Sequence, residues 1–205
     1  MLRLKDHSIS IVMLAAGRGT RMEAAGVPKM LLPLEGGDSL VRSAVRNALA
    51  MVPREMVVVV RPDLAGVVDA LRELPVRCVE NRRYMEGMGT SLAVGIAALD
   101  RETTAALVML GDEPAVHGSI VQALVDAYLR EGKAITTPMY GGQHGPPTLF
   151  SRELFGELSR LEGDSGGRQV ITRHPEMVCT VELGADDRPR DIDTPEDYRG
   201  IREGL

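Results

Sequence analysis

Short apolar runs alternate with amphipathic stretches along the whole chain. Continuous runs such as Val57–Val60 are typical of strands buried on both faces, as in parallel sheets. The longer stretches between these runs place apolar residues at helical spacing. The predicted strands are Ser10–Leu14, Met56–Val60, Val76–Glu80, Ala106–Leu110, Ala134–Pro138 and Met177–Val181, and the predicted helices are Ser39–Met51, Leu64–Glu73, Thr90–Asp100, Ser119–Arg130 and Ser151–Leu161.

This alternation predicts an α/β fold with a mostly parallel central sheet and helices on both of its faces. No repeat, low-complexity segment or long linker interrupts the 205 residues, so we expect one domain over residues 1–205. Any strand at Pro146 and Pro147 should be irregular or at an edge, because proline cannot keep both ladders of a central strand. Ligands of such sheets bind beyond the carboxyl ends of the strands, so the loops after the strands are the place to search.

Composition and charge narrow the expected partners. The net charge is -5 and aromatic residues make up 3% of the chain, which argues against nucleic acid as a partner. No apolar run reaches the roughly 18 residues that cross a bilayer, and no signal-peptide pattern opens the sequence. We therefore expect a cytoplasmic protein with no membrane partner. Cys78 and Cys179 lack metal-ligand spacing and lie in apolar runs, which favours a role as small buried apolar residues.

The loop after the first predicted strand combines small residues with cations. Its small or apolar residues are Leu14, Ala15, Ala16, Gly17 and Gly19, and its cations are Arg18, Arg21 and Lys29. Exposed amides in a glycine turn bind anions, and three cations around them suit a triphosphate. A Walker loop and a dinucleotide fingerprint are both excluded by the residues that follow the glycines. An ordinary glycine-rich strand–helix turn with solvated cations is the alternative.

An aspartate follows the fourth predicted strand. Asp112 lies in the run Gly111-Asp112-Glu113-Pro114, at a strand end where a hard cation would be needed. Mg²⁺ usually takes one or two protein carboxylates and completes its shell with water and phosphate oxygens. Because aspartate also favours turns, a purely structural role is the alternative.

Asp193 is the second candidate metal ligand. Thr194 as the N-cap, Pro195 at the first helical position and acids in the first turn predict that a helix begins here. Asp193 would then lie just before the N-cap, held by the start of the helix and free to bind a metal ion.

Together these segments resemble the MobA-like nucleotidyltransferases. Residues 14–34 are similar to the family's opening signature, L-A-A/G-G-x-x-x-R-M-G-x-x-K followed by Leu-Leu-Pro, although residues 23–25 are inserted before Lys29. Residues 111–114 and 191–197 are similar to its Gly-Asp-x-Pro and Asp-x-Asp-Thr-Pro-Glu-Asp elements, with Glu113 where the family usually has an uncharged residue. The run Ala15-Ala16-Gly17 resembles the molybdenum cofactor cytidylyltransferase branch of the family, whereas the guanylyltransferase branch typically has Ala-Gly-Gly there. The resemblance implies a three-layer αβα, Rossmann-like nucleotidyltransferase fold.

Three more segments are similar to family elements. Residues 87–92 resemble G-M-x-x-S-L, which implies Gly89 and Ser91 beside the base and ribose; helix capping by Thr90 or Ser91 is the alternative. Residues 141–150 resemble the acceptor-side G-H-P-x-L-F, with Pro146 where the family has its histidine and His144 displaced by two positions. A solvent-facing His144 is the alternative there.

Residues 162–168 resemble G-D-x-G-A-R. We expect Asp164 or Ser165 to cap the next helix, and Arg168 either to bind an anion or to pair with an acid.

The resemblance implies transfer of a nucleotide, CMP from CTP in preference to GTP, to the phosphate of molybdopterin, with Mg²⁺ as cofactor. A molybdenum hydroxylase or its chaperone is a candidate partner. The implied catalytic residues are Arg21, Lys29, Asp112 and Asp193, of which Asp112 and Asp193 bind the metal; the nucleotide is assigned to Leu14, Ala15, Ala16, Gly17, Gly19, Arg21, Lys29, Gly89, Ser91 and Asp112, and the acceptor to His144, Gly145, Pro146 and Arg168. One alternative is transfer to another phosphorylated acceptor, such as a sugar phosphate. The other is a catalytically inactive accessory protein that binds a nucleotide or cofactor.

Overall fold

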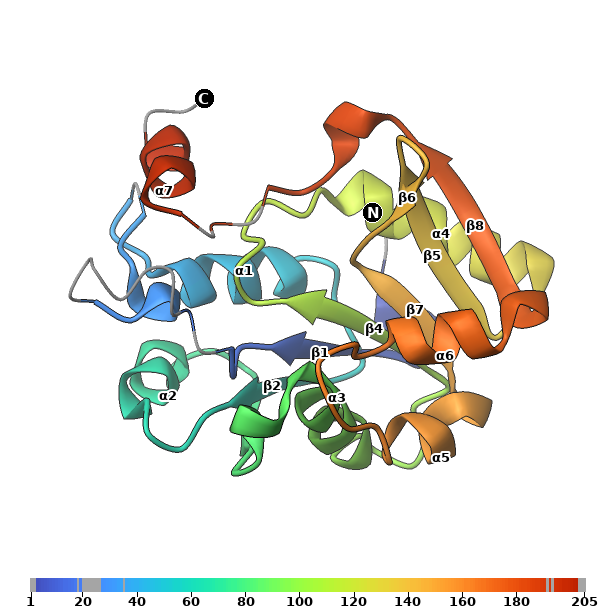
Figure 1. The fold of residues 1–205 in the computed structure, drawn as a ribbon, viewed down its shortest axis with the longest axis horizontal. Helices are drawn as coiled ribbons and strands as arrows, with labels where there is room; N and C mark the ends of the chain where they lie inside the picture. Colours follow the sequence, from blue (N-terminus) through green and yellow to red (C-terminus); the bar gives the residue numbers. More distant parts are fainter. Residues whose placement is uncertain are drawn as a thin grey trace.

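The computed structural model describes residues 3–17, 19, 27–34, 36–190, 192 and 194–202. Within these ranges an eight-stranded sheet has the order β3-β2-β1-β4-β7-β5-β6, and β8 pairs with β5 (Figure 1). The strands are β1 Ile9–Leu14, β2 Met56–Val60, β3 Arg77–Glu80, β4 Ala105–Leu110, β5 Ile135–Tyr140, β6 Gln143–His144, β7 Thr148–Ser151 and β8 Val178–Leu183.

Most neighbouring strands in this sheet are parallel, as predicted. β1 pairs in parallel with β2 and β4, β2 with β3, and β5 with β8. β7 is antiparallel to β4 and β5, and β6 is antiparallel to β5. Pro146 and Pro147, joined by a cis peptide bond, lie between β6 and β7, where their missing N–H groups interrupt no ladder.

The helices are α1 Leu40–Leu49, α2 Ala65–Leu71, α3 Met88–Ala97, α4 Gly118–Glu131, α5 Phe155–Leu158, α6 Arg168–Arg173 and α7 Pro195–Arg202, and short 3₁₀ segments lie at Leu4–His7, Lys29–Leu31, Tyr84–Glu86, Arg152–Leu154, Pro175–Met177 and Ala185–Asp187. The predicted start of α7 is confirmed. Asp197 N donates to Thr194 Oγ1 at 3.2 Å, and Thr194 N donates to Asp197 Oδ2 at 2.7 Å, which is a capping box.

The helix predicted over Ser151–Leu161 is shorter in the structure, because its first residue belongs to β7 and α5 ends at Leu158. Ser151 ends β7, and helical structure begins only with the 3₁₀ segment at Arg152 and continues as the short α5. Leu149 and Phe150 pair with β4 and β5 and are buried, so tertiary pairing decides the conformation here.

Two apolar cores lie on the two faces of the sheet. Alternate residues of β1 point to opposite faces: Ile11 and Met13 pack in the core under α1, α2 and α4, and Val12 and Leu14 pack in the core under α3, α5 and α6. In Figure 1, α1 is seen on one side of β1 and α3 on the other. The predicted three-layer arrangement is therefore confirmed.

The cysteines are less buried than predicted. Cys78 lies in β3 and Cys179 in β8, which are the edge strands of the described sheet, so both free thiols are only partly buried. Burial raises the pKa of both thiols. Among the described helices, none is both long enough and apolar enough to cross a bilayer.

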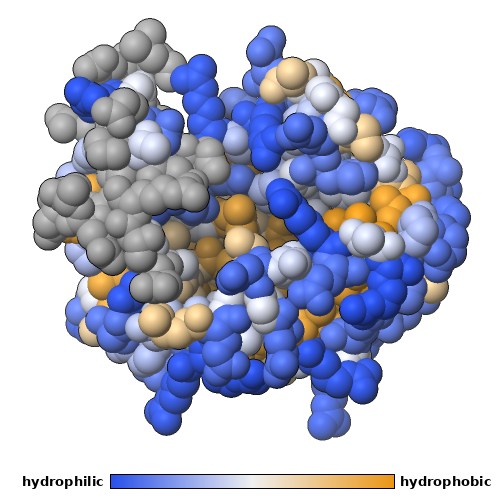
Figure 2. All heavy atoms as spheres, in the orientation of Figure 1, coloured by the Kyte–Doolittle hydropathy of each residue, from blue (hydrophilic) through white to orange (hydrophobic). Residues whose placement is uncertain are grey.

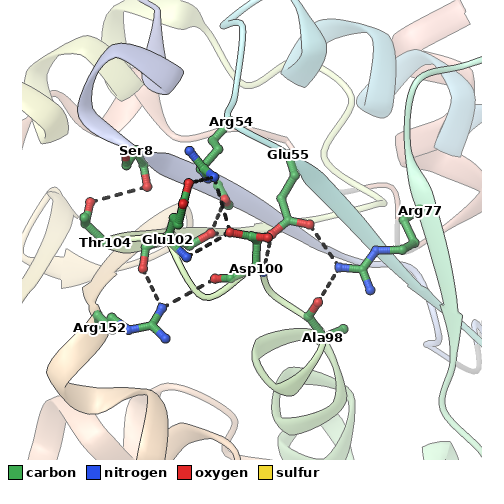
Figure 3. Close-up of polar contacts among 11 residues, drawn as sticks. Ser8, Arg54, Glu55, Arg77, Ala98, Asp100, Glu102, Thr104 and Arg152 are labelled. Carbon is green, nitrogen blue, oxygen red and sulfur yellow. Dashed lines mark hydrogen bonds and ion pairs between the residues drawn. The ribbon is translucent and has the colours of Figure 1, made fainter.

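A network of charged side chains links the segments at the amino ends of the central strands, away from the carboxyl ends where ligands are expected (Figure 3). Arg54 pairs with Asp100 and Glu102, and Arg77 donates to Glu55 at 2.9 Å. These residues join the segments before β2, β3 and β4. This network serves the fold and lies at the other end of the strands from the loops that the sequence marks as functional.

Helix α3 lies unusually close to the sheet because residue 95 has no side chain. A Cβ atom on Gly95 would lie 2.4 Å from Val12 Cγ1 and 3.0 Å from Val59 Cγ2. The missing side chain thus lets α3 pack directly on β1 and β2.

Replacing Gly95 should therefore loosen the α3 face of the sheet. We expect Gly95→Ala to lower the free energy of unfolding by about 1–3 kcal/mol, because the added methyl overpacks the core. Gly118→Ala is the matched control: it also lies in a helix, but its Cβ would meet nothing within 4 Å, so stability should stay unchanged or rise by up to about 1 kcal/mol. Urea titration measures both variants, and equal stabilities would contradict the close packing.

Candidate active site

The carboxyl ends of β1 and β4 meet at a glycine. The two strands stay in register to their last residues, Leu14 and Leu110, and Gly111 N donates to Leu14 O at 2.9 Å. A Cβ atom on Gly111 would lie 3.2 Å from both Leu14 O and Ala15 Cβ. The missing side chain thus lets Asp112 lie directly beside the loop after β1.

Lys29 reaches this aspartate from the far end of that loop. Its Nζ donates to Asp112 Oδ2 at 2.6 Å, and its side chain is only 6% exposed. Gly19 supports the lysine: its φ is +61°, and a Cβ there would lie 2.8 Å from Lys29 Cβ. The inserted residues 23–25 lie outside the described residues, yet Lys29 still meets Asp112.

Two adjoining cavities open at this edge of the sheet. The smaller, about 490 Å³, is lined by Lys29, Asp112 and the other predicted nucleotide residues Leu14, Ala16, Gly17, Gly19 and Ser91. The larger, about 830 Å³, is lined by the predicted acceptor residues His144, Gly145, Pro146 and Arg168. Leu14, Met88, Leu110 and Asp164 line both cavities. Figure 2 shows apolar side chains on the floor of the hollow on this face.

The loop after β1 presents backbone amides to the smaller cavity. Within the described residues the amides of Ala16 and Gly17 make no hydrogen bond, so they are available to an anion. Ala15 differs: it is fully buried, its amide donates to Val59 O at 2.9 Å, and it lines neither cavity. Ala15 therefore anchors the loop to the sheet.

Two predicted catalytic residues, Arg21 and Asp193, lie outside the described residues, as does Arg18. The described neighbour of Asp193 is informative. Ile192 is fully buried, and its amide donates to the carbonyl of Asp112 at 3.3 Å. The chain thus returns from β8 to the end of β4 at Asp112.

The start of α3 differs from the prediction. The helix begins at Met88, so Thr90 and Ser91 lie inside its first turn and neither caps it. The cap residue is Gly87, with φ +114°, and a Cβ on it would lie 2.4 Å from the carbonyl carbon of Gly163. Because the 163–164 loop packs directly on this position, only glycine fits there.

Gly89 has a packing role in the same contact. Its amide donates to Gly163 O at 2.7 Å, and a Cβ would lie 2.7 Å from Glu162 O. Gly89 lines neither cavity, whereas Ser91, one half-turn later, lines the smaller one.

Asn81 organises this wall and was missed by sequence reasoning. It is 1% exposed at the end of β3, and its Nδ2 donates to Thr90 Oγ1 at 2.9 Å and to Ser91 Oγ at 3.0 Å. Its Oδ1 accepts from Arg83 N at 2.8 Å. The available signal was a polar residue immediately after a predicted strand, similar to Asp112, which follows its own strand by two residues.

The predicted caps of α6 are also wrong. Its N-cap is Gly167 and no side chain caps it; Asp164 and Ser165 instead line the larger cavity. Arg168, the first residue of α6, lines the same cavity, and no acid in the described part of the chain pairs with it. Its guanidinium is therefore available to an anion.

Tyr140 holds the loop that carries the predicted acceptor residues. Its buried hydroxyl donates to Pro146 O at 3.0 Å, and a Cβ on Gly145 would lie 3.1 Å from its ring. Burial and then the carboxylate of buried Glu113 raise the pKa of Tyr140, so the hydroxyl keeps its proton. His144, on this loop, is half-buried on the cavity wall rather than free in solvent.

Comparison with known proteins agrees with this geometry. The sequence model of the MobA-like NTP transferase domain matches residues 11–178. The chain is 37% identical over 173 residues to the bifunctional protein GlmU of Clavibacter sepedonicus, which covers 81% of this chain and 34% of that protein. The chain therefore spans about a third of that relative's length. It is also 30% identical over 193 residues to the nicotine blue oxidoreductase of Paenarthrobacter nicotinovorans, covering 90% and 92% of the two chains.

Solved structures extend the similarity to the whole fold. Rv0371c from Mycobacterium tuberculosis H37Rv superposes with a TM-score of 0.82 at 28% identity, covering 99% of both chains. Rv0371c has also been solved in complex with manganese, with a TM-score of 0.77 at 28% identity over 96% of this chain and 99% of that one. On its sequence match and its fold, the chain belongs to the MobA-like nucleotidyltransferase family.

Proposed function

We propose that this nucleotidyltransferase moves CMP from CTP to the phosphate of molybdopterin and releases pyrophosphate, with Mg²⁺ as the divalent ion. The observation that carries the proposal is the pair of adjoining cavities, one lined by Lys29 and Asp112 and the other by Arg168. Two substrates bound side by side would meet at the four residues that line both cavities.

The smaller cavity suits a nucleoside triphosphate. Its volume of about 490 Å³ lies in the range of small-molecule sites, and its anion-binding groups gather at one end. These groups are the amides of Ala16 and Gly17 and the buried ammonium of Lys29. CTP is preferred to GTP because Ala16 resembles the cytidylyltransferase branch of the family.

The larger cavity suits an acceptor with a flat ring and one phosphate. Leu92, Val108, Phe150 and Ile171 supply apolar lining, and Arg168 supplies a cation. Thr137, Gln169 and Thr172 in the same lining supply hydrogen-bonding groups for the polar edge of a pterin ring. A sugar phosphate in the same cavity is the alternative acceptor.

The donor set fits a divalent ion. Asp112 supplies a hard carboxylate oxygen at a strand end, and the described residues hold no group of three or more potential ligands. Mg²⁺ needs only one or two protein carboxylates because water and phosphate oxygens complete its shell, so Asp112 together with Asp193 would suffice. When bound, the ion neutralises charge on the phosphates. The amide of Ile192, which follows Asp191 and precedes Asp193, supports this pairing through its bond to Asp112.

The reaction is an in-line displacement at the α-phosphorus. An oxygen of the acceptor phosphate forms the new P–O bond, the bond between the α-phosphorus and its bridging oxygen breaks, and that oxygen leaves with pyrophosphate. A phosphate monoester is largely a dianion at neutral pH, since its second pKa is about 6, so no general base is required. Lys29 and Arg21 stabilise the charge on the leaving group, and Arg168 orients the acceptor.

Removing the carboxylate charge of Asp112 should stop turnover. We expect Asp112→Asn to lower the rate of pyrophosphate release at least about 100-fold in the presence of CTP, molybdopterin and Mg²⁺, because the ion loses a ligand. Asp126→Asn, at an exposed position on α4, is the control and should keep full activity. Undiminished release by Asp112→Asn would contradict the metal role of this residue.

The same assay distinguishes the proposed transferase from an inactive accessory protein and from an oxidoreductase. An accessory protein would bind CTP but release no pyrophosphate above background. Because one relative is named an oxidoreductase, NADPH absorbance is followed in parallel, and no change is expected.

Removing the ammonium of Lys29 should weaken donor binding and lower the rate together. Lys29→Met keeps the length of the buried side chain but leaves phosphate charge uncompensated, so we expect a rise in KM for CTP and a fall in kcat of at least about tenfold. Lys133→Met, which removes an exposed lysine, should change neither parameter. Steady-state kinetics of the two variants make the measurement, and unaltered kinetics in Lys29→Met would show that its charge serves only Asp112.

The preference for CTP or GTP can be measured as a shift in melting temperature, without the acceptor. At a concentration 100 times its Kd, a ligand stabilises the folded state by about 2.7 kcal/mol. We expect CTP with Mg²⁺ to raise the melting temperature more than GTP with Mg²⁺ at equal concentration. A larger shift with GTP would overturn the assignment that rests on Ala16.

A further inference from the structure

Tyr84 is the aromatic side chain of the smaller cavity within the described part of the chain. It opens the 3₁₀ segment Tyr84–Glu86 after β3 and packs at the border of the core under α3. None of the sequence motifs marks it, and the displacement reaction does not use it.

The ring is held at two points by the loop that follows β2. Arg61 Cζ lies over the ring, 4.9 Å from its centroid, and Tyr84 Oη donates to Asp63 Oδ2 at 3.1 Å. Arg61 also donates to both oxygens of Asp63, at 2.7 and 2.6 Å. These hydrogen bonds from Arg61 hold the pKa of Asp63 well below its usual range, so the acceptor of the tyrosine proton stays ionised.

We call these two contacts, from Arg61 to the ring and from the Tyr84 hydroxyl to Asp63, the brace of Tyr84. The brace restricts the side chain before a ligand binds, so less conformational entropy is lost on binding. Arg61 lies over one face of the ring and, unlike Tyr84, does not line the smaller cavity, so we infer that the face not covered by Arg61 is the one that a flat ligand group can reach. A ring ordered before binding contributes more to affinity than a mobile one, because the entropy of ordering it has already been lost.

The order of the strands places Tyr84 at the far end of the cavity from the phosphate groups. Lys29 and Asp112 mark the end near β1 and β4, while Arg61 and Tyr84 follow β2 and β3, on the other side of β1. A triphosphate bound at Lys29 therefore directs the rest of the nucleotide toward Tyr84.

We propose that Tyr84, braced by Arg61 and Asp63, stacks on the base of the donor nucleotide. This inference rests on the proposed function only in requiring a nucleoside triphosphate in the smaller cavity. Stacking on an aromatic face tolerates any base, so Tyr84 supplies affinity and leaves the choice between CTP and GTP to other groups.

Equilibrium binding of CTP and of inorganic tripolyphosphate, each with Mg²⁺, tests the proposal, because the second ligand lacks a base. We expect Tyr84→Leu to weaken CTP binding about tenfold or more and to leave tripolyphosphate binding unchanged. Tyr84→Phe, which keeps the ring, should stay within about threefold of the parent for both ligands. Arg61→Met should weaken CTP binding severalfold and spare tripolyphosphate, because the ring loses its brace.

Tyr128→Leu is the matched control, since it removes a partly buried ring that packs in the other core. It should change neither affinity. Equal CTP affinity in Tyr84→Leu and the parent would overturn the proposal, and so would an equal loss of both ligands, which would mark the ring as structural. If Tyr84→Leu does not fold, parental CTP affinity in Arg61→Met overturns it.

The identity of the donor nucleotide is tested separately from the role of Tyr84. A parent that binds GTP in place of CTP contradicts the proposed donor, and the same variants measured with GTP then decide the role of Tyr84.

Discussion

The contact between Lys29 and Asp112 is the constraint on which the site depends. A nearly buried ammonium needs a partner, and the carboxylate meets it at 2.6 Å. The contact requires Gly111 to let β4 approach β1 and Gly19 to make room for the lysine stem. It also places a cation and a carboxylate at the end of the smaller cavity near β1 and β4, whereas Tyr84 and Met85 line the cavity from the segment after β3. The proposed orientation of the donor follows from this placement.

Much of the fold could be predicted from the sequence because its strands are buried on both faces. The run Met56–Val60 is apolar throughout, and the structure places β2 at the same residues. β6 and β7 were not predicted. β6 has two residues, and β7 follows a pair of prolines, so neither carries a periodic pattern of its own. β7 becomes a strand because Leu149 and Phe150 find partners in β4 and β5, residues that lie far away in the sequence.

In the candidate site, too, some residues could be predicted from the sequence and others could not. Lys29, Asp112 and Arg168 belong to motifs with recognisable spacing, and each lines a cavity. Asn81 and Tyr140 act through hydrogen bonds to residues on other segments, and the sequence marks only their position at a strand end, not those partners. The expected caps at Thr90 and Asp164 were wrong because a glycine is the N-cap of both helices. Gly87 packs against the backbone of Gly163, and Gly167 packs against the ring of Phe150, so tertiary packing overrides the local capping preference at both positions.

The hydrogen bond from Gly89 to Gly163 has a mechanical consequence. It joins the first turn of α3, beside the smaller cavity, to the loop before α6, beside the larger one. With no side chain between the two backbones, they lie in direct contact. Because this pair of segments borders both cavities, a displacement of either backbone moves the other, and the shapes of the two compartments are mechanically coupled.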